Sequence, residues 1–316
     1  MDKSAPIFVA GHRGLIGSAC VRLFMREGFS NVLTRTHAEL DLADERVVSA
    51  FFAEVEPTVV ILAAGKVGGI QQNKSHPADF MTENLQIQTS VLKSVFRHGV
   101  ERLVFFGSSC MYPRECLQPM SEQLLFTGKL EATSLAYAVA KLAGVQMCLA
   151  YNEQYGEKRF IPVIPNSTYG PFDNFDPGSS HVLSALIRRF HKAKQSEAPE
   201  VVLWGTGTPR RELIHADDVA DAVYFLLQRD TDHCDFPVNI GTGVDYSVAE
   251  LAQLVARIVG YSGMIGWDKT RPDGAPQKLL DNSRLLKMGW RPRVALESGI
   301  RQTYEWFLSC QQRVCA

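Results

Sequence analysis

The 316-residue chain is long enough for one large or two modest domains with a real hydrophobic core. Its hydrophobic content of 46%, charged content of 21% and net charge of −1 exclude a general attraction to nucleic acid or to an anionic membrane. Because no signal-peptide pattern or membrane-length apolar run is evident, and seven scattered cysteines contain no Cys-x-x-Cys pair, we expect a cytoplasmic protein without disulfides or a metal site.

The first predicted element is a buried strand at 7–10, which leads through a glycine-rich turn into a helix ending near Glu27. Glycines at this place permit a tight turn, close approach of the backbone to a pyrophosphate, and close helix–strand packing. The sequence therefore predicts a dinucleotide site. Its loop residues are Gly11, Arg13, Gly14, Leu15, Ile16 and Gly17.

The next strand, 31–34, indicates which nicotinamide cofactor is bound. A site for NAD would place an acidic residue at the end of this strand, but here the residue is Arg35, with His37 nearby and Arg13 in the glycine loop. Cations in place of an acid suit a 2′-phosphate, so NADP(H) is favoured over NAD. The alternative is that both arginines are ordinary surface residues. Asp41 and Leu42 are expected to line the adenine side.

The strand–helix pattern then repeats. A helix at 44–55 leads to a strand at 59–62, and a long helix from Pro77 to Gly99 precedes the next strand. This alternation predicts an α/β fold with a doubly wound parallel sheet. The small residues Ala63 and Ala64 would let the cofactor lie on the backbone. Lys66 is either a phosphate or substrate contact or a solvated lysine.

The chemistry is expected where the strand at 103–106 ends, because ligands of open α/β sheets gather at the carboxyl ends of strands. Ser108, Ser109 and Cys110 follow that end directly. Tyr137 and Lys141 come later on an Ala-rich helix, and their spacing of four puts them on one face. Alone, the serines could be a turn and the Tyr–Lys spacing a coincidence. Together they predict a proton-donating site for a carbonyl.

The second half of the chain changes character. After a strand at 160–164 come a polar loop at 172–180, a helix from His181 ending at 188–190, a strand at 201–204 and a final helix near 295–308. We expect residues 1–165, with 212–235 returning to them, to form the dinucleotide-binding Rossmann domain. Residues 166–211 and 236–316 are expected to form a smaller α/β substrate lobe.

At this point the chain resembles the extended short-chain dehydrogenase/reductases and, more narrowly, the GDP-L-fucose synthase family of 3,5-epimerase-4-reductases. The resemblance covers nearly the whole chain. Its motifs are Gly-x-x-Gly-x-x-Gly at 11–17, Lys66-Val67-Gly68-Gly69-Ile70, Gly107-Ser108-Ser109-Cys110, Tyr137-x-x-x-Lys141, Tyr169-Gly170-Pro171, Asp173-Asn174-Phe175, Ser180-His181-Val182, Trp204 to Pro209, Arg211-Glu212, Pro272-Asp273-Gly274 and Lys278 to Asp281.

The resemblance implies roles for individual residues. Tyr137 would protonate the 4-keto oxygen, Lys141 would hold the nicotinamide ribose and lower the pKa of that tyrosine, and Ser108 with Ser109 would orient the carbonyl. Cys110 and His181 correspond to the acid/base pair that epimerises carbons 3 and 5. The remaining implied contacts are Pro165 and His181 to the cofactor, and Lys66, Arg189, Trp204, Arg211, Asp273 and Lys278 to the GDP-linked 4-keto-6-deoxy sugar; the expected assembly is a homodimer.

Three departures from the family pattern cluster on the substrate side. Ser167 stands where an asparagine is usual, and Ala275 and Gln277 alter a run that usually carries an additional cation. A relative that only reduces, or that acts on another sugar such as a GDP-4-keto-6-deoxy-heptose, is therefore the main alternative. A non-catalytic NADP sensor is the alternative from another class, which the Tyr–Lys pair disfavours.

Overall fold

The computed structural model describes residues 1–229, 235–271 and 273–314. Its larger part is built on a six-stranded parallel sheet with the order β2-β1-β3-β4-β5-β9. The strands are β1 (Ile7–Ala10), β2 (Val32–Leu33), β3 (Val59–Leu62), β4 (Arg102–Phe106), β5 (Phe160–Pro165) and β9 (Val238–Ile240). From β1 the chain continues to β2 on one side and then to β3 on the other side, so the strand order reverses between β1 and β3. A doubly wound sheet binds its ligand at this point.

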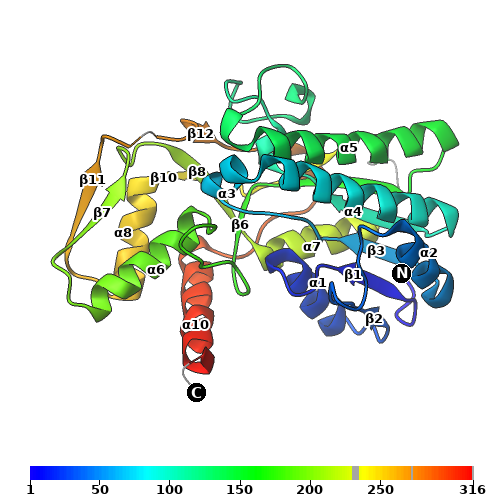
Figure 1. Ribbon diagram of the computed structural model, residues 1–316, viewed down its shortest axis with the longest axis horizontal. Coiled ribbons are helices and arrows are strands. Elements are labelled where there is room, and N and C mark those ends of the chain that lie inside the picture. The colour runs from blue at the N-terminus through cyan, green and yellow to red at the C-terminus, as the bar shows by residue number, and fades with distance from the viewer. Residues whose placement is uncertain (230–234, 272, 315–316) are drawn as a thin grey trace.

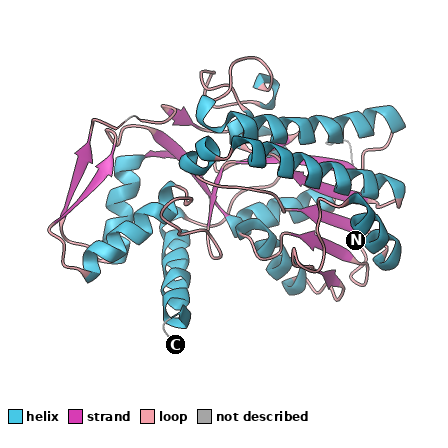
Figure 2. Ribbon diagram, viewed as in Figure 1, coloured by secondary structure: helices cyan, strands magenta, loops and turns pink. Residues whose placement is uncertain are grey.

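Helices cover both faces of this sheet (Figures 1 and 2). One face packs against α2 (Glu45–Val55), α4 (Pro77–Arg97) and α5 (Leu135–Tyr155). The other face packs against α1 (Leu15–Arg26) and α7 (Ala216–Leu227). Because both faces are buried, the strands are mainly apolar, and the runs at 7–10 and 59–62 are entirely so. The doubly wound fold predicted from the sequence is confirmed.

Helix α5 is mostly apolar, and many of its residues are buried. It packs side by side with α4 and also contacts β4 and β5 (Figure 1). By length and composition the segment 132–155 could cross a membrane, and it is the one such helix among the residues that the structure describes. Its contacts with α4 and the sheet are those of a core helix.

The smaller lobe extends from the carboxyl edge of the large sheet. A four-stranded sheet has β8 (Arg210–His215) at its centre, paired with β10 (Asp245–Ser247), β12 (Gln277–Lys278) and β6 (Ser167–Tyr169). A two-stranded sheet joins β7 (Glu200–Trp204) to β11 (Met264–Asp268). Around them lie α6 (Val182–Gln195), α8 (Val248–Val259) and α10 (Leu296–Val314), whose apolar faces form a separate core.

The predicted lobe boundaries need two corrections. Residues 212–215, expected to return to the Rossmann domain, lie in β8 of the smaller sheet. Strand β9 pairs with β5 in the large sheet, so the segment returning to the Rossmann domain continues past 235 through Ile240. Leu285 of α9 (Ser283–Met288) and Trp290 pack in the same core. A strand of three residues is too short to be recognised from an apolar pattern.

Two helices are longer than expected, since α6 continues to Gln195 and α10 to Val314. Five cysteines are free thiols, while Cys234 and Cys315 lie outside the described residues.

Candidate functional site

The glycine loop follows β1 at the point where the sheet reverses. Gly11 has a left-handed φ of +82°, and a Cβ built on it would lie 2.7 Å from the backbone nitrogen of Ala64. Glycine is therefore required for this loop to pack on the end of β3. Gly14 is the N-cap of α1 and provides no side-chain cap, so the first N–H groups of the helix have no side chain to satisfy them. This uncapped helix end fits a pyrophosphate.

Two predicted cations lie close together beside this loop. Hydrogen bonds from Thr36 lower the pKa of Glu39, and the charges of Arg35 and Arg13 lower it further, so both guanidinium groups lie near that carboxylate. The Glu39 carboxylate accepts from the Thr36 backbone nitrogen at 2.7 Å. Arg35 also lies 5.1 Å from the centre of the Phe51 ring. The pair is suitable for a phosphate, and Glu39 is an acidic neighbour that the sequence analysis overlooked.

The other residues predicted near the adenine differ in their exposure to solvent. His37 is exposed and lies 3.8 Å from Asp41. Leu42 is buried and packs in the core with α2, so its side chain is accounted for by folding. Ala63 and Ala64 follow β3 directly and face the glycine loop.

The predicted Ser–Tyr–Lys group is brought together where β4 ends. Ser108 begins a short 3₁₀ helix at Ser109–Met111, and Tyr137 and Lys141 lie on the first turns of α5, both buried. Burial and the negative charge of Cys110 raise the pKa of Tyr137, while a hydrogen bond with Ser108 opposes the rise. The predicted lowering by Lys141 is therefore not what the structure gives, because desolvation of the phenol dominates. A phenol that keeps its proton at neutral pH is suited to donate it.

Lys141 is 6% exposed, and burial lowers its pKa to about 8. Its ammonium lies 5.0 Å from the centre of the Phe105 ring, on β4. A Cβ built on Gly65 would lie 3.6 Å from the Lys141 nitrogen and 2.7 Å from the amide oxygen of Asn84. The loop after β3 thus runs directly over Lys141, and a side chain at position 65 would require the Asn84 amide to move.

Cys110 has an environment that favours its thiolate. The Lys278 ammonium lies 3.6 Å from its sulfur, and its backbone nitrogen donates to the Ser108 hydroxyl at 3.3 Å. Burial would raise the pKa of the thiol, but the charge of Lys278 and hydrogen bonds with Ser108 and Ser134 outweigh it and lower the pKa. A thiol so placed can act as a base.

His181 is the N-cap of α6 and is exposed. Its charge acts on the buried carboxyl of Asp173, whose pKa burial raises and which the Ser184 hydroxyl contacts. The preceding residues Ser179 and Ser180 pack against Gly69, so this segment borders the loop that follows β3.

Four of the predicted substrate residues form two groups in the smaller lobe, Arg189 with Trp204 and Arg211 with Asp273. Arg189 lies 6.0 Å from the centre of the Trp204 ring, which is 60% exposed, and Arg271 lies 5.2 Å from the same ring. Asp273 accepts from the Thr206 backbone nitrogen at 2.9 Å and so fixes the loop after β7. Arg211 lies farther in, on β8, where burial lowers its pKa and the charges of Asp273 and Cys110 oppose that effect.

Lys66 is arranged differently from the other cations. Its ammonium contacts Glu83 and lies 3.7 Å from Asp79, both on α4. The Glu83 contact raises the pKa of the lysine. Its charge is thus balanced by two carboxylates of the protein, which neither of the two readings from the sequence anticipated.

Three residues with evident roles were missed or left unassigned. Ser134 hydrogen-bonds Cys110, Asn84 bonds both backbone groups of Lys66, and the buried Glu212 accepts from the backbone nitrogens of Leu280 and Gly243. The position of Ser134, three residues before Tyr137, could have pointed to it. The other two are polar residues in apolar surroundings, a pattern that does not reveal their partners.

Comparisons with known proteins identify the family of the chain. Residues 7–241 match the NAD dependent epimerase/dehydratase family. GDP-L-fucose synthase 1 of Arabidopsis thaliana is 53% identical over 309 residues, covering 97% of this chain and 94% of its own. The structure of a GDP-6-OMe-4-keto-L-xylo-heptose reductase from C. jejuni superposes with a TM-score of 0.92 at 38% identity, covering 98% and 99% of the two chains. A GDP-mannoheptose C4 reductase from Campylobacter jejuni with NADP bound gives 0.87 at 37%, with the same coverage.

Proposed function

The chain belongs to the NAD dependent epimerase/dehydratase family and to its GDP-L-fucose synthases, and on that basis we propose that it converts a GDP-4-keto-6-deoxy-mannose-type sugar to GDP-L-fucose. The reaction is 3,5-epimerisation followed by reduction of the 4-keto group. The observation that carries this proposal is the single cluster at the end of β4. There the acid of a reductase, Tyr137, and a thiol favoured as a base, Cys110, share the hydroxyl of Ser108.

The cofactor is NADP(H), which when bound supplies the hydride to carbon 4. The uncapped N-terminus of α1 with Gly11, Gly14 and Gly17 suits its pyrophosphate, and Arg13 with Arg35 suits the 2′-phosphate. Lys141 would hold the ribose hydroxyls under the loop at Gly65. Ala63 and Ala64 follow β3, Pro165 ends β5, and these residues would complete the cradle.

In the reduction, Tyr137 donates its phenolic proton to the 4-keto oxygen as that oxygen gains negative charge. Burial keeps the phenol protonated until then, since it raises the pKa. Ser108 holds the oxygen in place, and Lys141 provides a positive charge on the same face of α5. A positioned acid of this kind contributes about 10²–10⁴-fold.

In the epimerisation, the Cys110 thiolate removes a proton from carbon 3 or 5, and the C–H electron pair moves onto the 4-keto oxygen as an enolate. The enolate collapses when protonated histidine, His181, returns a proton to the opposite face of that carbon. The products are a thiol and a neutral imidazole, which exchange protons with water before the next step.

The nucleotide-sugar is expected on the smaller lobe. Trp204, flanked by Arg189, offers an exposed ring for stacking, and Arg211 offers a cation for the diphosphate. Asp273 would act mainly by fixing the loop at Thr206. We propose that Lys66 mainly holds its own loop against α4, through Glu83 and Asp79, and contacts the sugar only weakly.

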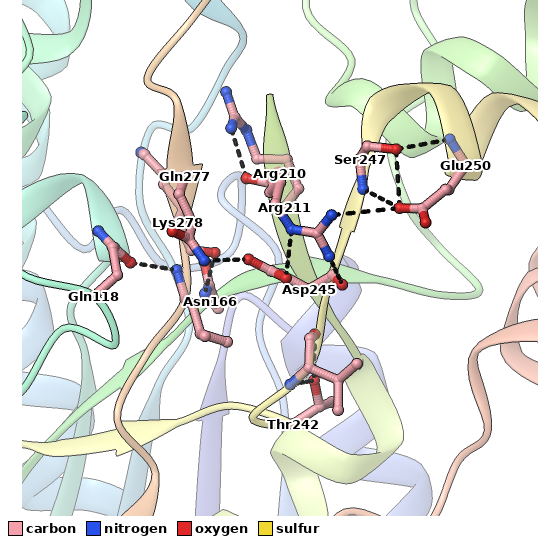
Figure 3. Close-up of polar contacts among 12 residues, drawn as sticks. Gln118, Asn166, Arg210, Arg211, Thr242, Asp245, Ser247, Glu250, Gln277 and Lys278 are labelled. Carbon is pink, nitrogen blue, oxygen red and sulfur yellow. Dashed lines mark hydrogen bonds and ion pairs between the residues drawn. The ribbon is translucent and has the colours of Figure 1, made fainter. Parts of the chain in front are cut away.

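A second candidate is a 4-reductase of a related GDP-heptose, because the structural match to the heptose reductase reaches a TM-score of 0.92. Ser167, Ala275 and Gln277 depart from the fucose synthase pattern on the substrate side. Gln277 donates to Asp245 at 2.6 Å, and Arg210 shares that carboxylate (Figure 3). At position 277, where the family pattern carries an additional cation, this chain thus has a neutral amide that bonds within the smaller sheet.

The two candidates differ in one measurement. Enzyme with the 4-keto-6-deoxy sugar in deuterated water, without NADPH, should incorporate deuterium at carbons 3 and 5 if it is an epimerase. NADPH oxidation over a panel of GDP-linked 4-keto sugars identifies the preferred substrate. A substrate that is reduced but never exchanges at either carbon would make the protein a simple 4-reductase.

The setting of the enzyme is also a proposal. We place it in the cytoplasm, where its free thiols would stay reduced. We further propose a homodimer, measurable by light scattering. The Rossmann domain then comprises 1–165 and 216–240, and the substrate lobe comprises most of the remainder.

A further inference from the structure

The contact between Lys278 and Cys110 joins residues 168 positions apart and is set by strand pairing. Strand β12 pairs in parallel with β8 so that Lys278 lies opposite Arg211. Its side chain reaches Cys110 with the ammonium 3.6 Å from the sulfur.

Side chains of other segments hydrogen-bond the backbone at and directly after Lys278 (Figure 3). The amide of Asn166 donates to the Lys278 carbonyl at 3.4 Å, and Gln118 accepts from the next backbone nitrogen, that of Leu279, at 2.9 Å. The buried Glu212 accepts from Leu280 at 2.8 Å. Three side chains from separate segments thus fix the strand at this residue. Such fixation is what a precise charge contact requires.

From these contacts we infer that Lys278 is a positioning residue that acts through Cys110, holding it as the thiolate that serves as the base. The thiolate state itself is independent of what the enzyme acts on; its use in epimerisation rests on the proposed function. Cys110 faces Lys278 on β12, Arg211 on β8 and Tyr137 on α5, and it is hydrogen-bonded with Ser108 and Ser134. Of the two cations, Lys278 is in direct contact.

The test is the pH dependence of Cys110 alkylation by iodoacetamide, followed by mass spectrometry of the peptide that contains it. In the wild type the midpoint should lie below the ordinary thiol value of about 8.5. Lys278→Met should raise it by about 1–2 pH units, so alkylation at pH 7 slows about tenfold or more. Lys278→Arg, which keeps the charge, should retain most of the wild-type rate.

Arg210→Met is the matched control, because it removes a cation one position away on the same strand pair. Arg210 lies opposite Gln277 and bonds Asp245 at 2.8 Å, so its loss should leave the midpoint of Cys110 unchanged. Thermal unfolding of each variant confirms that it is folded. A wild-type midpoint at or above the ordinary value overturns the inference whether or not any variant folds.

Two kinetic measurements separate this role from substrate binding. Lys278→Met should slow deuterium exchange at carbons 3 and 5 about tenfold or more, while the KM for a pre-epimerised keto-sugar stays within about twofold. An increase in that KM with an unmoved alkylation midpoint would make Lys278 a substrate ligand instead and overturn the inference. If the alkylation midpoint moves but no substrate ever exchanges, the charge contact stands and the proposed epimerase function fails.

Discussion

Replacing Lys141 by methionine should stabilise the protein while abolishing its reductase activity. Lys141 is 6% exposed, and burial lowers its pKa from the ordinary 10.5 to about 8. A difference of about 2.5 pH units corresponds to about 3 kcal/mol, which is the order of magnitude of the cost of burying this charge. Methionine has a similar length and packs well against an aromatic ring such as Phe105, so it removes the charge without leaving a cavity.

The pH dependence has a definite sign. Below pH 8 the lysine is charged in the folded and unfolded states, and the buried charge carries its full cost. Between pH 8 and 10.5 the folded state loses a proton that the unfolded state keeps, so wild-type stability rises with pH relative to the variant. Above 10.5 both states are neutral, and the advantage of Lys141→Met disappears.

Thermal unfolding without added cofactor measures this directly. An unfolding entropy of about 2.1 cal/mol/K per residue gives about 0.66 kcal/mol/K for the chain, so Lys141→Met should raise Tm by about 5 °C at pH 7 and by only about 1–2 °C at pH 10. Lys93→Met is the matched control, since Lys93 is half exposed and pairs with Glu45 at 2.6 Å, and it should not raise Tm. A Tm of Lys141→Met below that of the wild type at pH 7, or a difference that does not change with pH, would refute the reasoning.

Three other substitutions test the assigned roles. Tyr137→Phe should lower kcat about 10²–10⁴-fold with nearly unchanged NADPH affinity by fluorescence titration, and retained turnover would make Tyr137 a packing residue. Arg35→Ala should raise the KM for NADPH about tenfold or more and leave that for NADH unchanged, whereas equal effects on both would remove the 2′-phosphate assignment. Cys110→Ser should slow deuterium exchange at carbons 3 and 5 at least 10²-fold while a pre-epimerised substrate is still reduced; unaltered exchange would assign the base elsewhere.

The parts of the site that sequence predicts well are those set by short-range geometry. The glycines at 11–17 could be read as a phosphate loop because strand, turn and helix follow one another within a few residues. Tyr137 and Lys141 could be paired because a spacing of four fixes their relation on any helix. The end of β4 could be located because a buried parallel strand leaves an apolar run that stops at a glycine.

The parts that sequence missed depend on long-range register. Lys278 was expected at the sugar, but its distance from Cys110 is set by the pairing of β12 with β8. Strand β12 has only two residues, so no pattern marks it. Lys66 was expected to contact the substrate or solvent, and its two carboxylate partners became visible only when α4 was placed against the loop. The acidic partners of a lysine cannot be identified from spacing when they lie on a separate element.

The two chemistries proposed for the site reinforce one another through charge. Cys110 and Tyr137 lie close enough that negative charge on the sulfur raises the pKa of the phenol. A thiolate ready to remove a proton therefore also keeps Tyr137 protonated and ready to donate one. Ser108 is hydrogen-bonded with both groups, and these bonds lower the pKa of the phenol and the pKa of the thiol alike. Ser108 therefore does not widen the difference between the two pKa values. Loss of the Lys278 charge should consequently lower the thiolate fraction of Cys110 directly. It should affect the pKa of Tyr137 only indirectly, because that pKa responds to the charge of Cys110.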